Sequence, residues 1–177
     1  IPLLAVLVLL LAAISIRVPG YIPKSYMNVL KNGSINMVLS CGMLCVLLVG
    51  SIDISITAIL AFVGCVTGKL MGMGAIQSVF LMFALGILIG AGIGLVNGVL
   101  MSYGRVVSII VTLSTSYIVR ALIPMQWLMG MNKINPTDLT DGFAFFLTRN
   151  SFLGLPLLVW MAIAVTVITG VFLKYTR

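Results

Sequence analysis

The sequence contains no glutamate and no histidine, and only three of its 177 residues are acidic. These absences argue against a zinc site, a catalytic carboxylate pair and a histidine-based triad. Charged residues make up 7% of the chain, whereas a soluble domain has about 25%. We therefore predict no catalytic residue, no metal ligand and no cofactor, and we expect a protein that is not an enzyme.

Apolar residues dominate instead, at 62% of the chain, with a mean hydropathy of +1.28. This composition predicts an integral membrane protein. The net charge of +7 is spread thinly over short connections, which is typical of membrane flanks and argues against a nucleic-acid partner. The three cysteines, at positions 41, 45 and 65, lie in apolar segments without the spacing of a disulfide framework.

About 20 apolar residues cross a bilayer as a helix, so the apolar runs predict an all-α bundle of about six membrane spans. The runs are 1–16, 34–50, 55–71, 75–103, 106–131 and 155–175. Pro156 suits the first turn of the last helix. The longest connection, 132–154, alternates aromatic and polar residues and is either an interfacial segment or a partner-docking surface. Because the chain starts inside an apolar run, we expect residues 1–177 to be the N-terminal portion of one longer transmembrane domain.

The segment 50–55, GSIDIS, interrupts two uncharged apolar runs with the carboxylate of Asp53. A charge in such surroundings requires a partner, water or a cation. Gly50, Ser51 and Ser55 make the segment a polar break. Two interpretations remain open: a loop at the membrane surface, or an intramembrane break whose backbone is satisfied by protein or a water-filled cavity.

Two further polar residues interrupt apolar helices. Asn97 either holds a neighbouring helix or lines a pathway. Arg120 lies about fourteen residues into its span, and it either extends toward the membrane surface or pairs with Asp53. The hydroxyl-rich stretch 108–116 either bonds to its own helix carbonyls or offers a surface to a sugar.

A glycine ridge runs along the fourth span, with a glycine at every fourth position: Gly86, Gly90, Gly94 and Gly98. Such a ridge allows another helix to approach closely. It predicts a tight helix contact, either within the chain or at a dimer seam.

Four blocks in order resemble the permease subunits of bacterial ATP-binding-cassette (ABC) sugar importers, the type that serves ribose, xylose, galactose or autoinducer-2. Segment 50–55 resembles the family's Gly-Gly-Ile-Asp-Leu-Ser, and 94–98 resembles Gly-Leu-Leu-Asn-Gly. Segment 105–113 resembles Arg-Val-Pro-Ser-Phe-Ile-Val-Thr-Leu, and Arg120 matches a later arginine; the fourth block comprises 153–156 and 174–177. The chain departs from this pattern at Ser51, Ile56, Thr57, Val107 and Ser114.

The resemblance implies a multi-pass subunit of a bacterial cytoplasmic (inner) membrane, part of a roughly ten-span permease that translocates a monosaccharide. Its implied partners are an ABC ATPase, a periplasmic or extracellular sugar-binding protein, a second permease subunit in a homo- or heterodimer, and membrane lipid. The segment that docks the ATPase follows the family's Thr-Arg, so it is expected beyond residue 177. On this interpretation Asp53, Ser55, Asn97 and Arg120 are the candidates for the substrate pathway.

Alternative functions remain open. A permease for branched-chain amino acids or nucleosides shares the expected fold. An ion-coupled secondary transporter would use Asp53 as its proton or cation site, and it would need a gradient where an importer needs an ATPase. A truncated, non-functional copy is a third alternative.

Overall fold

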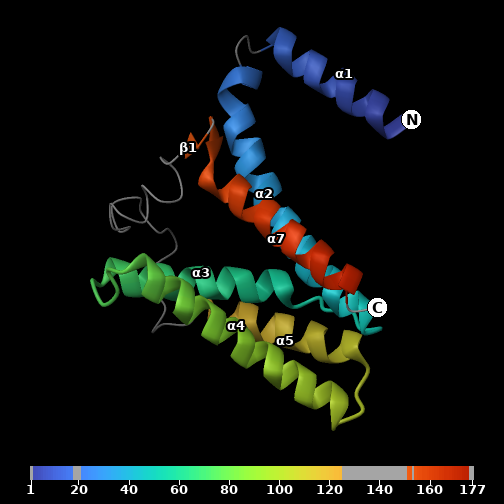
Figure 1. Ribbon diagram of the computed structural model, residues 1–177, viewed down its shortest axis with the longest axis vertical. Helices are drawn as coiled ribbons and strands as arrows, with labels where there is room; N and C mark the ends of the chain where they lie inside the picture. The colour runs from blue at the N-terminus through green and yellow to red at the C-terminus, as the bar shows by residue number, and fades with distance from the viewer. Residues whose placement is uncertain (1, 18–20, 125–150, 153, 176–177) are drawn as a thin grey trace. The chain divides into compact units, whose positions relative to one another are not determined.

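The structure of the chain is a computed structural model that describes residues 2–17, 21–124, 151–152 and 154–175 (Figure 1). The regular secondary structure of the described part is helical apart from one antiparallel pair of two-residue strands. In chain order the elements are α1 (Pro2–Arg17), α2 (Tyr21–Leu48), α3 (Ile56–Gly72), α4 (Val79–Ser102), α5 (Ser108–Leu122), β1 (Ser151–Phe152), β2 (Leu155–Pro156) and α7 (Leu157–Tyr175). The predicted all-α class is confirmed.

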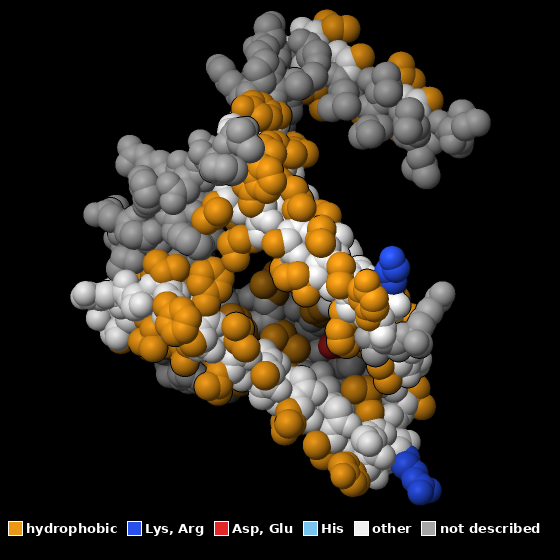
Figure 2. Space-filling model, viewed as in Figure 1, with side chains coloured by type: hydrophobic (Ala, Val, Ile, Leu, Met, Phe, Trp, Pro, Cys, Tyr) orange, Lys and Arg blue, Asp and Glu red, His pale blue; other side chains and the backbone are white. Residues whose placement is uncertain are grey.

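Three described helices are long and apolar enough to cross a membrane: Ser25–Leu48 within α2, Val79–Ser102 and Leu157–Tyr175. Two shorter apolar helices, α3 and α5, lie between them in the sequence. The α1 helix has 16 residues and covers the first apolar run. Apolar side chains are spread along the described helices in Figure 2, as expected for helices that face lipid.

Several predicted boundaries were wrong. α2 begins at Tyr21 rather than near position 34. Pro23 does not prevent this early start, because it lies in the first turn, where a missing N–H is tolerated. α5 ends at Leu122, shortly before Pro124, and the rest of the predicted fifth span from 125 to 131 lies outside the described residues. Pro156 pairs with Ser151 in the strand pair directly before α7, and is not in its first turn. The connection 132–150 also lies outside the described residues.

Glycines in the left-handed conformation end two helices. Gly50 follows α2 with a φ of 77°, and Gly74 follows α3 with a φ of 72°. At α2, the Gly50 N–H donates to the Leu47 carbonyl and the Ser51 N–H to the Val46 carbonyl. This is the Schellman arrangement, which satisfies the last carbonyls of a helix. The polar break therefore starts with a defined stop signal.

The described residues form two compact units. In the unit that contains residues 1–38 and 151–177, α7 contacts β2 and buries Ala162. In the unit 39–150, α3 contacts both α4 and α5, and α4 contacts α5 (Figure 1). Ala58 of α3 and Val111 and Val119 of α5 are buried in this three-helix cluster. The cluster positions the candidate site.

The glycine ridge of α4 meets a neighbouring helix at only one position. A Cβ atom added to Gly86 would lie 3.2 Å from Val63 Cγ1 of α3, whereas one added to Gly90, Gly94 or Gly98 meets no described atom within 4 Å. A four-residue step rotates about 40° around a helix of 3.6 residues per turn, so the ridge turns by about 120° between Gly86 and Gly98. The ridge therefore leaves the α3 contact, and its role beyond Gly86 stays a prediction.

Replacing Gly86 with leucine is expected to lower the free energy of unfolding in detergent by about 1–3 kcal/mol, because the added side chain overpacks against Val63. Gly94→Leu is the matched control: Gly94 lies on the same helix with no described neighbour, and the expected change is within about 0.5 kcal/mol. Equal losses in both variants would contradict the packing described.

Candidate functional site

The backbone of the polar break is paired with side chains of α5. The Ile52 N–H donates to the Ser108 hydroxyl over 3.2 Å. The Thr112 hydroxyl lies 3.2 Å from the Ile52 carbonyl and 2.9 Å from the Ser108 carbonyl, so its proton is shared between them. Thr112 is fully buried. Both polar groups of the Ile52 peptide thus find partners within the chain.

Asp53 and Ser55 form a tight local turn. The Ser55 N–H donates to Asp53 Oδ1 over 2.8 Å, and the Ser55 hydroxyl donates to the same oxygen over 2.6 Å. This is the Asx-type pattern, in which a side chain bonds the backbone two residues on. Ser55 precedes α3 but makes no side-chain capping bond to it; its φ of −79° and ψ of −15° are helical, whereas an N-cap residue usually has an extended backbone.

Asn97 connects this turn to two helices. Its Nδ2 donates to the Ser55 hydroxyl over 3.1 Å, and its Oδ1 accepts from the Thr115 hydroxyl over 2.6 Å. Ser55 is 0% exposed and Asn97 is 2% exposed, whereas Asp53 is half-buried. The amide therefore ties α4 to α5 and to the start of α3 from inside the cluster.

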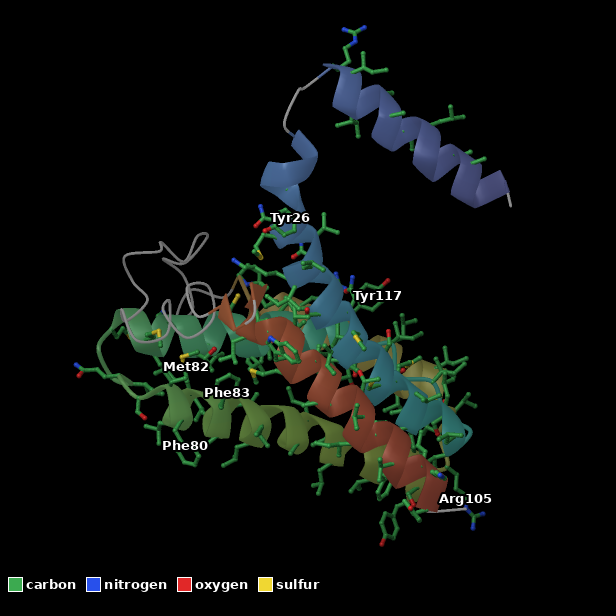
Figure 3. All side chains as sticks on the ribbon, turned by 45° about the horizontal axis from the view of Figure 1, so that its top comes forward. Tyr26, Phe80, Met82, Phe83, Arg105 and Tyr117 are labelled. Atoms are coloured by element: carbon green, nitrogen blue, oxygen red, sulfur yellow. The ribbon has the colours of Figure 1, made fainter. Side chains whose placement is uncertain are left out.

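The polar break contacts α4 some distance before the end of that helix. Asn97 is five residues before the end of α4 at Ser102, which corresponds to about 8 Å along the helix axis. The connection that follows turns at Gly104, where an added Cβ would collide with the Leu100 carbonyl, and at Arg105, which has a φ of 53°. Arg105 projects outward from this turn (Figure 3). Ser55 thus bonds to α4 about one and a half helical turns before the α4–α5 connection begins.

Three of the four predicted pathway residues, Asp53, Ser55 and Asn97, come together in this network. The fourth, Arg120, is exposed and lies on α5 eight residues beyond Thr112, or about 12 Å along the axis. The residues that the structure describes include no ion pair between Asp53 and Arg120, and the carboxylate accepts its bonds from Ser55. Their roles in a pathway stay a prediction.

The partners on α5 were missed by the sequence analysis. Ser108, Thr112 and Thr115 appeared there only as members of a hydroxyl-rich stretch. Thr112 does bond to its own helix carbonyl, but it also reaches Ile52. A signal was present: positions 108, 112 and 115 are spaced four and three apart, so they share one helix face.

Two departures from the family motif are compatible with this geometry. Arg105 is the only non-glycine residue with a positive φ among the described residues, so Ser51 takes a conformation that does not require glycine. Val107 precedes α5 with a φ of −59°, which is the value that a proline ring imposes. The backbone at both positions keeps a shape that the family's residues would also adopt.

Asn97→Ala is expected to lower the free energy of unfolding in detergent by about 1–3 kcal/mol, because two interhelical bonds are lost and the Thr115 donor is left unpaired. Thr67→Val is the matched control. Thr67 is also buried, but its hydroxyl bonds only to carbonyls of its own helix. If the control lost as much free energy of unfolding as Asn97→Ala, the interhelical bonds of Asn97 would contribute no more to stability than a bond within one helix.

Losses caused by substituting Asp53 and Arg120 are expected to add, because the two side chains share no described partner. The measurement is a double-mutant cycle with Asp53→Asn and Arg120→Gln, scored by unfolding free energy in detergent. A coupling above about 0.5 kcal/mol would instead show that the two charges interact.

Comparisons with known proteins agree with the motif blocks. The chain is 32% identical over 172 residues to the L-arabinose ABC transporter permease protein AraH of Azospirillum brasilense, which covers 97% of this chain and 49% of that protein. It is 28% identical over 173 residues to the ribose import permease protein RbsC of Haemophilus influenzae, covering 96% of this chain and 52% of the relative. The Escherichia coli K12 protein RbsC is 33% identical over 91 residues, or 50% of this chain and 28% of the relative.

No protein-family model matches the chain, and no solved structure matches it. The chain spans about half the length of the curated relatives it matches over most of its residues. The relationship and the apolar helices place it as a multi-pass protein of a bacterial cytoplasmic membrane. The chain is thus a relative, over nearly its whole length, of the permease subunits of bacterial ABC sugar importers.

Proposed function

We propose that this chain is part of a permease subunit of an ABC importer that carries a monosaccharide across the cytoplasmic membrane. The observation that carries the proposal is the similarity of 172 residues, at 32% identity, to a protein named as an L-arabinose permease. The names of the ribose permeases support the same substrate class. The substrate proposed is therefore a pentose or a related monosaccharide.

The transport energy would come from partners. The 177 residues contain no glycine-rich phosphate loop followed by lysine and serine or threonine, so ATP hydrolysis is assigned to a separate ATPase subunit. A sugar-binding protein outside the membrane would deliver the substrate. A second permease subunit would complete the pathway, and rocking of the helix bundles would give alternating access.

The pathway proposed passes the polar break. Asp53 is the only acidic residue among the described residues, and it is partly exposed between apolar helices. Ser55 and Asn97 are buried in the described conformation, so they would support the pathway from behind Asp53. Arg120, exposed on α5, would contact the substrate at a different level from Asp53.

The test is uptake into proteoliposomes that hold the complete subunit containing this chain, its second permease subunit and its ATPase. Radiolabelled L-arabinose and ribose are supplied with the sugar-binding protein. Uptake is expected to require both the binding protein and hydrolysable ATP inside the vesicle. A non-hydrolysable ATP analogue is the matched control.

The alternative function makes the opposite prediction, because a carboxylate at an intramembrane break also suits an ion-coupled carrier. Sugar uptake that follows an imposed proton or sodium gradient without ATP would establish that carrier and overturn the importer. Uptake of branched-chain amino acids or nucleosides, but not of sugars, would retain the ABC mechanism and overturn the substrate.

A further inference from the structure

Three side-chain hydrogen bonds at the polar break run in one direction. Thr115 donates to Asn97, Asn97 donates to Ser55, and Ser55 donates to Asp53. A hydroxyl has one proton, and the Ser55 proton goes to Asp53 Oδ1, so Ser55 can only accept from Asn97 and the carboxylate end sets the direction of this chain of bonds. Consecutive bonds of this kind polarise and strengthen one another. The side-chain orientations are therefore interdependent.

The network has one open end. Both bonds from Ser55 fall on Asp53 Oδ1. Among the residues that the structure describes, no donor reaches Asp53 Oδ2 and no basic side chain pairs with the carboxylate. Asp53 is half-buried, whereas Ser55 and Asn97 are almost completely buried. The network therefore leaves one carboxylate oxygen, Asp53 Oδ2, without a bond among the described residues.

We propose that Asp53 Oδ2 accepts a hydrogen bond from a hydroxyl of the transported sugar, and that Asn97 and Thr115 are positioning residues that hold it through Ser55. The inference rests on the proposed function and deepens it. A monosaccharide carries several hydroxyl donors and no charge. It can therefore donate a hydrogen bond to a carboxylate oxygen without bringing a charge into the site. Asn97 acts from behind Asp53, since it is only 2% exposed in the described conformation.

The role of Thr115 follows from the direction of the chain. Its hydroxyl holds Asn97 Oδ1 and so fixes which end of the amide faces Ser55. Without that hydroxyl the amide is free to rotate, and Oδ1 then competes with Asp53 for the Ser55 proton. The carboxylate then keeps only the bond from the Ser55 backbone N–H, so its orientation is held less firmly although no group that contacts the sugar has changed.

The experiment measures how well the reconstituted transporter distinguishes its sugar from monodeoxy analogues, each of which lacks one hydroxyl. For each variant, the uptake rate of the sugar is divided by that of every analogue at saturating binding protein. The contribution of the binding protein is the same in all variants and cancels when ratios are compared with wild type. We expect Asp53→Asn and Thr115→Val to lower the ratio for one analogue about threefold to tenfold, the value of one ordinary hydrogen bond.

Two variants serve as controls. Thr115→Ser keeps the hydroxyl and is expected to retain the wild-type ratio. Thr67→Val is expected to retain it as well, because the Thr67 hydroxyl bonds only within α3. A Thr115→Val protein that transports more slowly but discriminates like wild type would overturn the positioning role. An Asp53→Asn protein with unchanged discrimination would overturn the contact with the sugar. A wild-type transporter that moves no sugar would refute the proposed function itself, which is a separate outcome.

Discussion

The unwound backbone between α2 and α3 is the constraint on which the rest of the site depends. A peptide in apolar surroundings must find hydrogen-bond partners for its N–H and carbonyl groups. At Ile52 these partners are the hydroxyls of Ser108 and Thr112 on α5. Side chains in the first turns of α5 therefore bond the backbone of the break, and these bonds hold α5 close to the start of α3.

The Asn97 amide extends this arrangement from the backbone to the side chains. Satisfying Ser55 from α4 leaves the serine proton for Asp53, so the pairing of helices and the orientation of the carboxylate have the same origin. The break is thus a packing element, and under the proposed function it is also the place where a polar group would meet the substrate. Ser55 bonds to Asn97, which lies about 8 Å before the end of α4, and the depth of the break in the membrane stays a prediction.

The polar candidates chosen from the sequence differ in how far they are buried and in how many of their polar atoms are bonded. All were selected by one criterion, a polar group in an apolar run. Asn97 is 2% exposed with both ends of its amide bonded, Asp53 is half-buried with one oxygen unbonded among the described residues, and Arg120 is exposed. Polarity in an apolar segment identifies a residue that needs a partner, and only the neighbours decide whether that partner is protein or ligand.

Composition and apolar run length alone determined that this chain is an all-α membrane protein, and the motif blocks identified its relatives, because both properties are read locally along the chain. The stop at Gly50, the start of α3 and the positions of Asp53 and Asn97 as polar interruptions of apolar segments were also visible in the sequence. The tertiary structure decided that Ser108, Thr112 and Thr115 complete the break, and that only Gly86 of the ridge meets α3. These contacts join residues 18 to 60 positions apart, and they depend on how each helix is rotated against its neighbours, which local periodicity does not specify.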